Sequence, residues 1–320
     1  MIPVDDILIA GRHLAPHLPR TPLLHSPWLS ARAGAEVRLK LESLQVTRSF
    51  KVRGALNALT RLASMQPRPV VVTASAGNHG RAVAWAAQRL GLQAVVFTPS
   101  QAPQAKLGPI REHGADLRPV AADYEDAERM AIEFARASGA VFVSPYSHND
   151  VIAGGGTVAL EIREAWPEVD AIVVAIGGGG LISGIARFAK ASSPPLRVVG
   201  VEAEQSCAFT AARAAGRIVP VRVGRSLADG LGGNVDPATL TWEYIRELVD
   251  QVVTVSEEDL SEGLRGLVAN DHLLAEGAGV AAVAAVAARR VSLDGARVAV
   301  VVSGANIDTA KLVEVLTATV

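Results

Sequence analysis

The segment AIVVAIGGGGLISGIARFAKA, residues 171–191, decides the class of fold. It begins with a β-branched run, passes through four consecutive glycines and continues from Leu181 into a predicted helix. A strand that enters a helix through a glycine turn is the repeating unit of α/β proteins. Bare backbone N–H groups at a helix N-terminus also bind anions well, so the glycine loop is a candidate phosphate site.

Short β-branched runs alternate with helical patterns over the whole chain, which is typical of parallel sheets covered by helices on both faces. We predict strands near Val37-Leu41, Val70-Thr73, Ala94-Phe97, Leu117-Val120, Val141-Val143, Ala171-Ile176, Arg197-Glu202 and Arg297-Val302. We predict helices near Lys51-Ala63, Asn78-Leu90, Pro103-His113, Glu125-Ser138, Thr157-Ala165, Leu181-Ala191, Glu257-Asn270, Gly279-Arg290 and Ile307-Leu316.

Length, charge and cysteine content favour a metabolic enzyme of the cytoplasm. At 320 residues the chain is long enough for two domains or one large α/β unit. A net charge of -1 gives no electrostatic footprint for nucleic acid or an anionic membrane. Cys207 is the single cysteine, which excludes an intramolecular disulfide and a cysteine-cluster metal site. The N-terminus is acidic, and the longest apolar run is split by glycines, so we expect neither a signal peptide nor a membrane span.

One lysine, Lys51, stands in the segment SFKVRGA, residues 49–55, ahead of a predicted helix. Phe50 and Val52 flank it with apolar surface. A partly desolvated lysine forms Schiff bases with carbonyl compounds, above all with pyridoxal phosphate (PLP). A solvated surface group is the ordinary alternative for a lysine near a helix start. The presence of a phosphate-binding loop elsewhere makes Lys51 a candidate catalytic residue.

Polar loops follow two further Val-rich strands. ASAGNHG occupies residues 74–80, and SGAN occupies residues 303–306. Side chains at the carboxyl ends of parallel strands can point into a shared crevice. There the amide of Asn78 can hold a phenolate oxygen, whereas Ser303 either reaches into the crevice or caps the next turn.

The glycine loop also raises the alternative of a dinucleotide site. Glu202 lies at the end of the next predicted strand, about where an acidic residue of a Rossmann fold binds a ribose. The GxGxxG spacing is not met, because its third glycine would fall at Ile182 or Ser183. This disfavours a dehydrogenase and leaves a nucleotide-binding protein without PLP as a secondary alternative.

Together the motifs resemble those of the PLP-dependent serine/threonine dehydratases, or threonine ammonia-lyases, which have the tryptophan-synthase-β-like fold and are related to serine racemase. The similarity runs from residues 20–23 to residues 303–308. It implies an α/β fold with two doubly wound, parallel-type sheets covered by helices and the cofactor between two domains. The implied large domain comprises residues 1–46 and 145–320, and the implied small domain comprises residues 47–144.

The resemblance also implies a role for each motif. Lys51 carries PLP as a Schiff base, the ring of Phe50 packs on the pyridine ring, and Asn78 bonds the cofactor atom O3′. The hydroxyl of Ser303 faces the pyridine nitrogen N1. The implied phosphate ligands are Gly177, Gly178, Gly179, Gly180 and Leu181. The implied receivers of the substrate carboxylate are Ser75, Ala76, Gly77, Asn78 and His79.

The implied activity is β-elimination of water from a β-hydroxy amino acid, with L-threonine or L-serine as the expected substrate and a 2-oxo acid and ammonia as products. Lys51 takes the α-proton as general base. A neutral hydroxyl at N1 makes the ring a weaker electron sink than an aspartate would, so loss of the β-hydroxyl competes well. For His79 we prefer a backbone-orienting role to that of a general base. We expect a homodimer or homotetramer.

Departures from the family pattern concern substrate and metal. Arg48 stands where many relatives have glycine, and it is strained if that position needs φ > 0. We interpret Arg48 as a surface or subunit-interface residue. The alternative is that its charge selects an anionic substrate. Glu202 matches the first acidic residue of a cation site in racemase-like members, but Ala208 replaces the second, so we expect no bound metal.

Two further departures bear on the type of reaction. Ala76 stands where serine racemases have a serine, and the glycines of residues 229–233 stand where racemases present a serine hydroxyl to the substrate. Both favour elimination over racemisation. A serine or aspartate racemase and a 3-hydroxyaspartate dehydratase remain the alternatives to the threonine or serine ammonia-lyase.

Overall fold

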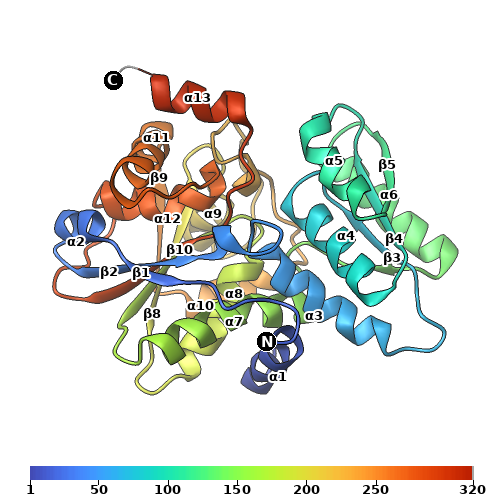
Figure 1. Ribbon diagram of the computed structural model, residues 1–320, viewed down its shortest axis with the longest axis horizontal. Coiled ribbons are helices and arrows are strands. Elements are labelled where there is room, and N and C mark those ends of the chain that lie inside the picture. The colour runs from blue at the N-terminus through green and yellow to red at the C-terminus, as the bar shows by residue number, and fades with distance from the viewer. Residues whose placement is uncertain (319–320) are drawn as a thin grey trace.

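The computed structural model describes residues 1–318, in which two sheets are each covered by helices on both faces (Figure 1). The larger sheet has the strand order β1-β2-β10-β7-β8-β9 and is parallel except for β1, which runs antiparallel to β2. Its strands are β1 (Leu23–His25), β2 (Glu36–Leu41), β7 (Ala171–Ala175), β8 (Arg197–Ala203), β9 (Gln251–Val255) and β10 (Arg297–Val302). The smaller sheet is parallel and has the order β5-β4-β3-β6. Its strands are β3 (Val71–Ala74), β4 (Ala94–Pro99), β5 (Asp116–Ala121) and β6 (Val141–Phe142).

Each face of the larger sheet has its own core. One core includes residues of α2 (Pro27–Ala33), α11 (Glu257–Gly266), α12 (Gly277–Ala287) and α13 (Thr309–Thr317). The other includes residues of α7 (Asn149–Ala165), α8 (Gly180–Ala191), α9 (Ala208–Ala215) and α10 (Thr241–Leu248). In β10, Val300 packs into the first core and Val301 into the second. A strand buried on both faces must be apolar throughout, which is why these strands are continuous β-branched runs.

The strands of the smaller sheet are also packed on both faces. Val71 of β3 packs with α3 (Lys51–Ala63) and α4 (Asn78–Leu90), and Val72 packs with α6 (Tyr124–Ser138) on the other face. Helix α5 (Gln104–Glu112) lies beside α4, and α1 (Val4–Leu14) packs against α7 of the larger sheet. The remaining elements are the short turns η1 (Glu42–Leu44), η2 (Asp229–Leu231) and η3 (Leu267–Asp271).

The α/β class, the parallel-type sheets and all eight predicted strands are confirmed. Six further elements were not predicted from the sequence: β1, β9, α1, α2, α9 and α10. The three residues of β1 are too few to show a period, and β1 is the antiparallel exception to the predicted parallel pairing. Among residues 1–318 no helix is long and apolar enough to cross a membrane.

Helix α7 begins at Asn149 and not near Thr157 as predicted, and it contains three consecutive glycines. Glycine lowers helix propensity, which hid the first two turns. The structure shows what offsets this cost: a Cβ on Gly154 would lie 2.5 Å from the carbonyl oxygen of Arg53, and one on Gly156 would lie 2.9 Å from that of Gly184. The glycines allow α7 to pack closely on α3 and α8, so tertiary contacts override the local preference.

Candidate active site

Lys51 is the first residue of α3, and the segment before it is joined to the end of β10. Ser49 forms an isolated β-bridge with Gly304, and the Phe50 N–H donates to the Ser303 carbonyl at 3.0 Å. Two motifs that are about 250 residues apart in the sequence therefore share backbone hydrogen bonds. The tertiary fold fixes the position of Lys51 relative to Ser303.

The Lys51 amine donates to the Pro145 carbonyl at 2.8 Å. Burial lowers the pKa of Lys51 to about 8, with only partial opposition from the charge of Glu276. A hydrogen bond to a neutral carbonyl stabilises the ammonium less than an ion pair would. A pKa of about 8 leaves about a tenth of the amine neutral at pH 7, which supplies the form that a nucleophile requires.

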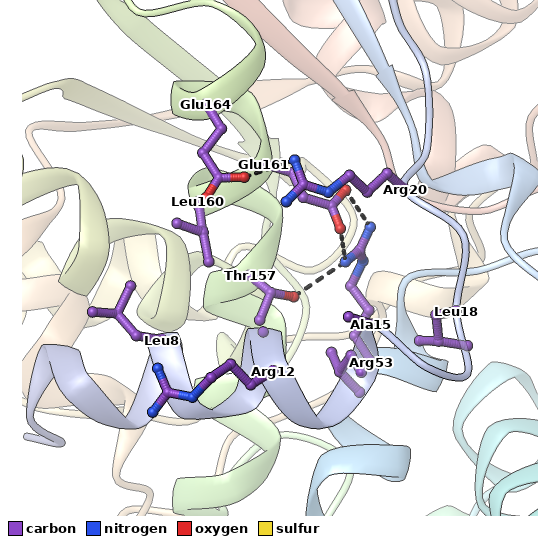
Figure 2. A pocket seen from close by; sticks show the side chains of 12 residues that line it. Leu8, Arg12, Ala15, Leu18, Arg20, Arg53, Thr157, Leu160, Glu161 and Glu164 are labelled. Atoms are coloured by element: carbon purple, nitrogen blue, oxygen red, sulfur yellow. Dashed lines mark hydrogen bonds and ion pairs between the residues drawn. The ribbon is translucent and has the colours of Figure 1, made fainter.

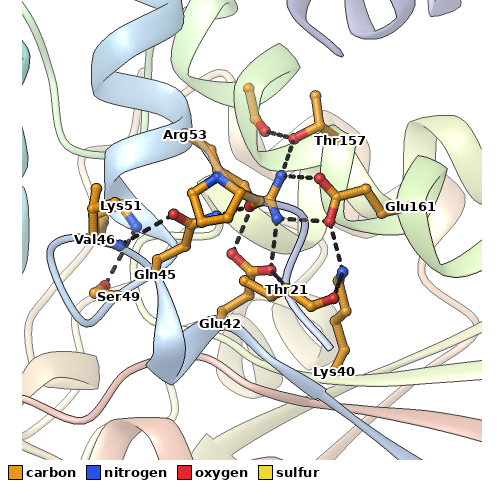
Figure 3. Close-up of polar contacts among 12 residues, drawn as sticks. Thr21, Lys40, Glu42, Gln45, Val46, Ser49, Lys51, Arg53, Thr157 and Glu161 are labelled. Carbon is orange, nitrogen blue, oxygen red and sulfur yellow. Dashed lines mark hydrogen bonds and ion pairs between the residues drawn. The ribbon is translucent and has the colours of Figure 1, made fainter. Parts of the chain in front are cut away.

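A buried charge network holds the first turn of α3 in place (Figure 3). Arg53 donates to both carboxylate oxygens of Glu42 at 2.7 and 2.9 Å and to both of Glu161 at 2.7 and 2.8 Å. Lys40 donates to Glu161 at 2.6 Å, and Thr21 donates to Glu42 at 2.6 Å. Burial opposes the charge of Arg53, but the two carboxylates outweigh it and raise the arginine pKa. The network joins α3 to β2, η1 and α7, two residues from Lys51.

Asn78 is the first residue of α4 and lies between two polar side chains. Its Nδ2 donates to Glu276 at 2.6 Å, and its Oδ1 accepts from the Asn306 amide at 2.6 Å. A side-chain amide carries two N–H groups, so the hydrogen bond to Glu276 leaves Asn78 a second donor. Asn78 also lies near the end of β10, because a Cβ on Gly304 would lie 3.4 Å from its Nδ2.

Glu276 is a site residue that the sequence analysis missed. Burial raises its pKa to about 7, although the hydrogen bond from Asn78 and the charge of Lys51 oppose this shift. Its backbone N–H donates to the Gly304 carbonyl at 3.0 Å, which places the carboxyl group beside the end of β10. The available signal was a lone acidic residue directly before the apolar segment of α12.

The loop of residues 75–78 is half-buried at the start of α4. The Gly77 N–H is engaged by the Ser75 hydroxyl at 3.2 Å. His79 is buried, and its Nε2 donates to the Val143 carbonyl at 3.2 Å. Burial and the nearby charge of Lys51 lower the His79 pKa to about 3, so the ring is neutral and contacts backbone. Ala76 belongs to this loop, and its side chain is a methyl group.

The glycine loop joins β7 to α8, as predicted. Its Cβ positions are occupied by protein: a Cβ on Gly178 would overlap the ring of Tyr146, and one on Gly179 would lie 2.9 Å from Thr241. Gly179 also has φ +88, a conformation that favours glycine. The sequence analysis attributed the glycines to the approach of a phosphate, whereas in the structure neighbouring side chains already require them.

Ser303 follows β10 and is buried, with a relative exposure of 5%. Its hydroxyl makes one long hydrogen bond, 3.5 Å to the Ala278 carbonyl, among the described residues. A distance at this limit marks a weak bond, so the hydroxyl can turn toward a stronger partner. The alternative role of Ser303, capping the next turn, requires a hydrogen bond from a following backbone N–H to its hydroxyl. No such bond is present among the described residues.

Arg48 has φ +59, the left-handed conformation in which arginine is strained. Its side chain is exposed, and its backbone N–H donates to Gln45 at 2.7 Å. The backbone at position 48 therefore adopts φ > 0, and the predicted strain of Arg48 is present. Glu202 is buried and accepts hydrogen bonds from the backbone N–H groups of Phe209 and Thr210 at 2.8 and 2.7 Å.

A cavity of about 340 Å³ lies between α1 and α7, on the side of the buried charge network (Figure 2). It is lined by leucines of both helices, and its polar lining residues are Arg12, Arg20, Arg53, Thr157, Glu161 and Glu164. Lys51, Asn78, Ser303 and the glycine loop are not among its lining residues. We therefore locate the active site by the contacts of Lys51 and not by this cavity.

Comparisons with known proteins establish the family. The family model for pyridoxal-phosphate dependent enzymes matches residues 14–304. The chain is 40% identical over 308 residues to the L-threonine ammonia-lyase of Thermotoga maritima, covering 96% of this chain and 76% of the relative. It is 35% identical over 316 residues to the catabolic L-threonine dehydratase of Escherichia coli K12, covering 98% and 96%.

Solved structures agree with these relatives. Maize serine racemase matches with a TM-score of 0.90 and 32% identity, covering 97% of this chain and 95% of that one. The processed form of threonine deaminase isoform 2 from Solanum lycopersicum matches with a TM-score of 0.91 and 30% identity, covering 99% and 92%. The chain belongs to the family of PLP-dependent enzymes, and the resemblance seen in its sequence is confirmed. PLP is its cofactor.

The residues of the site fit this cofactor. Among the described residues, the Lys51 amine donates one hydrogen bond, to a carbonyl, and Ser303 offers a weakly bonded hydroxyl. Asn78 retains a free N–H, and Gly180 opens α8 with backbone N–H groups that have no partner within the helix. An amine, neutral donors and a helix N-terminus are the groups that an aldehyde, a pyridine ring and a phosphate require.

Proposed function

We propose that the enzyme is an ammonia-lyase that removes water from L-threonine or L-serine and releases a 2-oxo acid and ammonia. The observation that carries the proposal is the Lys51 amine, which is held by the Pro145 carbonyl and has its pKa lowered to about 8 by burial. Such a group can serve as both nucleophile and general base. The threonine-deaminating relatives from Thermotoga maritima and Escherichia coli support the choice of reaction.

The residues around Lys51 would each bind a different part of PLP. Asn78 would donate its free N–H to O3′ of PLP, Ser303 would face N1, and the ring of Phe50 would pack on the pyridine. Residues 177–181 would hold the phosphate at the N-terminus of α8. When bound, PLP supplies an electron-withdrawing ring that stabilises the carbanion left by loss of the α-proton.

The Lys51 amine would then begin the reaction of the substrate by acting as general base. The freed amine takes the α-proton, and the bond between Cβ and the hydroxyl oxygen then breaks with its electron pair on oxygen. The hydroxide takes up one proton and leaves as water, so the proton consumed there balances the one gained by Lys51. The resulting enamine is hydrolysed to the 2-oxo acid and ammonia, so the water that is lost is balanced by the water taken up. Residues 75–79 would hold the substrate carboxylate beside Lys51. His79 is neutral and its ring is hydrogen-bonded to the backbone, so we assign the role of general base to Lys51.

Racemisation is the second candidate, because the chain is structurally similar to maize serine racemase and to an aspartate racemase matched with a TM-score of 0.88. Racemisation requires a proton donor on the face of Cα opposite Lys51. The methyl group of Ala76 can neither give nor take a proton. We therefore expect negligible D-serine from L-serine, and some gain of racemisation in Ala76→Ser.

Turnover across a small panel tests the proposal. L-threonine, L-serine and 3-hydroxyaspartate would be assayed for 2-oxo acid and ammonia, and a chiral assay would follow serine. We expect threonine or serine to give equal amounts of 2-oxo acid and ammonia, and Lys51→Ala to abolish both. D-serine formed as fast as pyruvate would contradict the lyase assignment. A clear preference for 3-hydroxyaspartate would move the substrate to the anionic class and make Arg48 its first candidate ligand.

Three further points are proposals. We infer a small domain of residues 47–144, supported by the four-stranded sheet, whose strands all fall within it. We infer a homodimer or homotetramer, supported by exposed apolar side chains such as Leu24 and Leu44, and light scattering would test this. We also infer a cytoplasmic location, supported by a single cysteine and by the bacterial catabolic relative, and fractionation would test it.

A further inference from the structure

The connection between β6 and α7, residues 143–148, is fastened along its whole length. The Val143 carbonyl accepts from the Thr73 hydroxyl at 2.8 Å and from the His79 ring at 3.2 Å. The Ser144 hydroxyl accepts from the Ser147 N–H at 3.1 Å, and the Ser147 hydroxyl accepts from the Leu240 N–H at 3.0 Å. We call this segment the connector. Its hydrogen bonds hold it to β3 and α4 on one side and to Leu240, the residue before α10, on the other.

Two adjacent residues of the connector contact two different parts of the active site. The Pro145 carbonyl accepts from the Lys51 amine at 2.8 Å. Tyr146 packs on the glycine loop: a Cβ on Gly178 would overlap its ring at Cγ, and a Cβ on Gly180 would lie 2.9 Å from its Cα. The connector therefore contacts both Lys51 and the glycine loop, through two neighbouring residues.

This contact explains why the loop needs glycine at these positions. A real Cβ on Gly178 would push either the loop or the Tyr146 ring out of place, and the ring cannot yield freely because the connector is fastened. The backbone of Gly178 is also held from the other side, where the Thr241 hydroxyl donates to its carbonyl at 2.9 Å. The loop is thus clamped between Tyr146 and α10.

We propose that Tyr146 is a positioning residue that sets the distance between the phosphate site and Lys51. The inference rests on the proposed assignment of residues 177–181 to the phosphate of PLP. The aldehyde carbon and the short arm that carries the phosphate are both attached to the rigid pyridine ring of PLP, so a covalent bond to Lys51 and a phosphate at the loop can form together only within a narrow range of separations. Tyr146 acts on the cofactor through the loop and need not touch it.

The ring of Tyr146, and not its hydroxyl, makes this contact. The hydroxyl lies in a separate environment, where burial and the charges of Glu128 and Asp236 raise the pKa of Tyr146 to about 12 and keep it protonated. Tyr146→Phe keeps the ring and is the matched control. Tyr146→Ala removes the ring and leaves the loop unsupported on that side.

The test is the preference of the apoprotein for PLP over pyridoxal, which lacks the phosphate. Both would be titrated by absorbance into wild type, Gly178→Ala, Tyr146→Ala, Tyr146→Phe and the double variant Gly178→Ala/Tyr146→Ala. We expect Gly178→Ala to lower the preference for PLP about tenfold, since overpacking a fastened contact is costly. The double variant should recover most of the lost preference for PLP. In Tyr146→Ala the preference should fall severalfold, and in Tyr146→Phe it should equal that of wild type. Thermal melting of each apoprotein would verify folding.

The outcomes separate the two claims. A preference that falls in Gly178→Ala and does not recover in the double variant would overturn the role of Tyr146 and leave the phosphate assignment intact. A preference unchanged in Gly178→Ala would show that the loop does not bind the phosphate. If Gly178→Ala does not fold, Tyr146→Ala alone decides: a preference equal to that of wild type would refute the proposal.

Discussion

Replacing Arg53 by methionine tests the buried charge network on which the first turn of α3 depends. Arg53 and Glu42 are 1% and 0% exposed, so neither charge is solvated by water. Methionine fills most of the arginine volume but provides no charge. Within residues 1–318, Glu42 then keeps one side-chain partner, the Thr21 hydroxyl, and Glu161 keeps one, the Lys40 amine. Removing one partner of a buried ion pair costs about 3–5 kcal/mol, because the remaining charge is left without compensation.

We therefore expect the free energy of unfolding of Arg53→Met to fall by about 3–5 kcal/mol, a large part of the roughly 5–15 kcal/mol that holds most domains folded. Urea unfolding of the apoprotein would measure it. Adding Glu42→Gln should restore more than about 1 kcal/mol, because the orphaned charge is gone. The matched control is Arg20→Met, since Arg20 pairs with Glu164 at the surface, with exposures of 71% and 43%. That variant should lose less than about 1 kcal/mol.

The pH dependence gives a second test with a defined sign. In wild type, burial would raise the pKa of Glu161, but the hydrogen bonds and charges of Arg53 and Lys40 lower it. Without Arg53, the pKa of Glu161 loses the hydrogen bonds and the charge of the arginine that lower it, while burial still raises it. The folded variant then binds more protons than folded wild type at acidic pH, so the stability lost on substitution grows as pH rises through the titration range of this carboxyl group. The loss should be smaller at pH 5 than at pH 8. A loss below about 1 kcal/mol, or no recovery with Glu42→Gln, would refute the reasoning.

Three other substitutions or labelling experiments test the site. Arg48→Gly should raise the free energy of unfolding by up to about 1 kcal/mol in thermal melts, because relief of the left-handed strain exceeds the entropy cost of glycine; a loss of stability would show that the arginine makes a contact of its own. Acylation of Lys51 in the apoprotein, followed by mass spectrometry, should have a midpoint near pH 8, since burial lowers its pKa. Ser303→Asp should slow elimination and give a new long-wavelength absorbance with substrate, and an unchanged rate without that band would argue against contact with N1.

The sequence by itself determined the elements whose patterns are local. Strands buried on both faces are continuous β-branched runs, so β7, β8 and β10 could be predicted within a residue or two. The first residue of α3 and of α4 was also predicted, because Lys51 and Asn78 each begin a helical pattern after a polar loop. The motifs themselves indicated the family and the cofactor.

What only the tertiary structure decided depends on contacts between distant segments. Glu276 joins the site because it lies at the start of α12 beside Asn78, 198 residues away in the sequence, and its one local signal, an acidic residue before an apolar segment, does not indicate an active site. The first half of α7 forms although glycines disfavour helix, because only glycine lets it pack closely on α3 and α8. The glycine loop has no room for side chains at Gly178 and Gly180 because Tyr146 already fills their space. Local patterns encode backbone preference and burial, but the neighbour that will occupy a given space is settled only when the chain has folded.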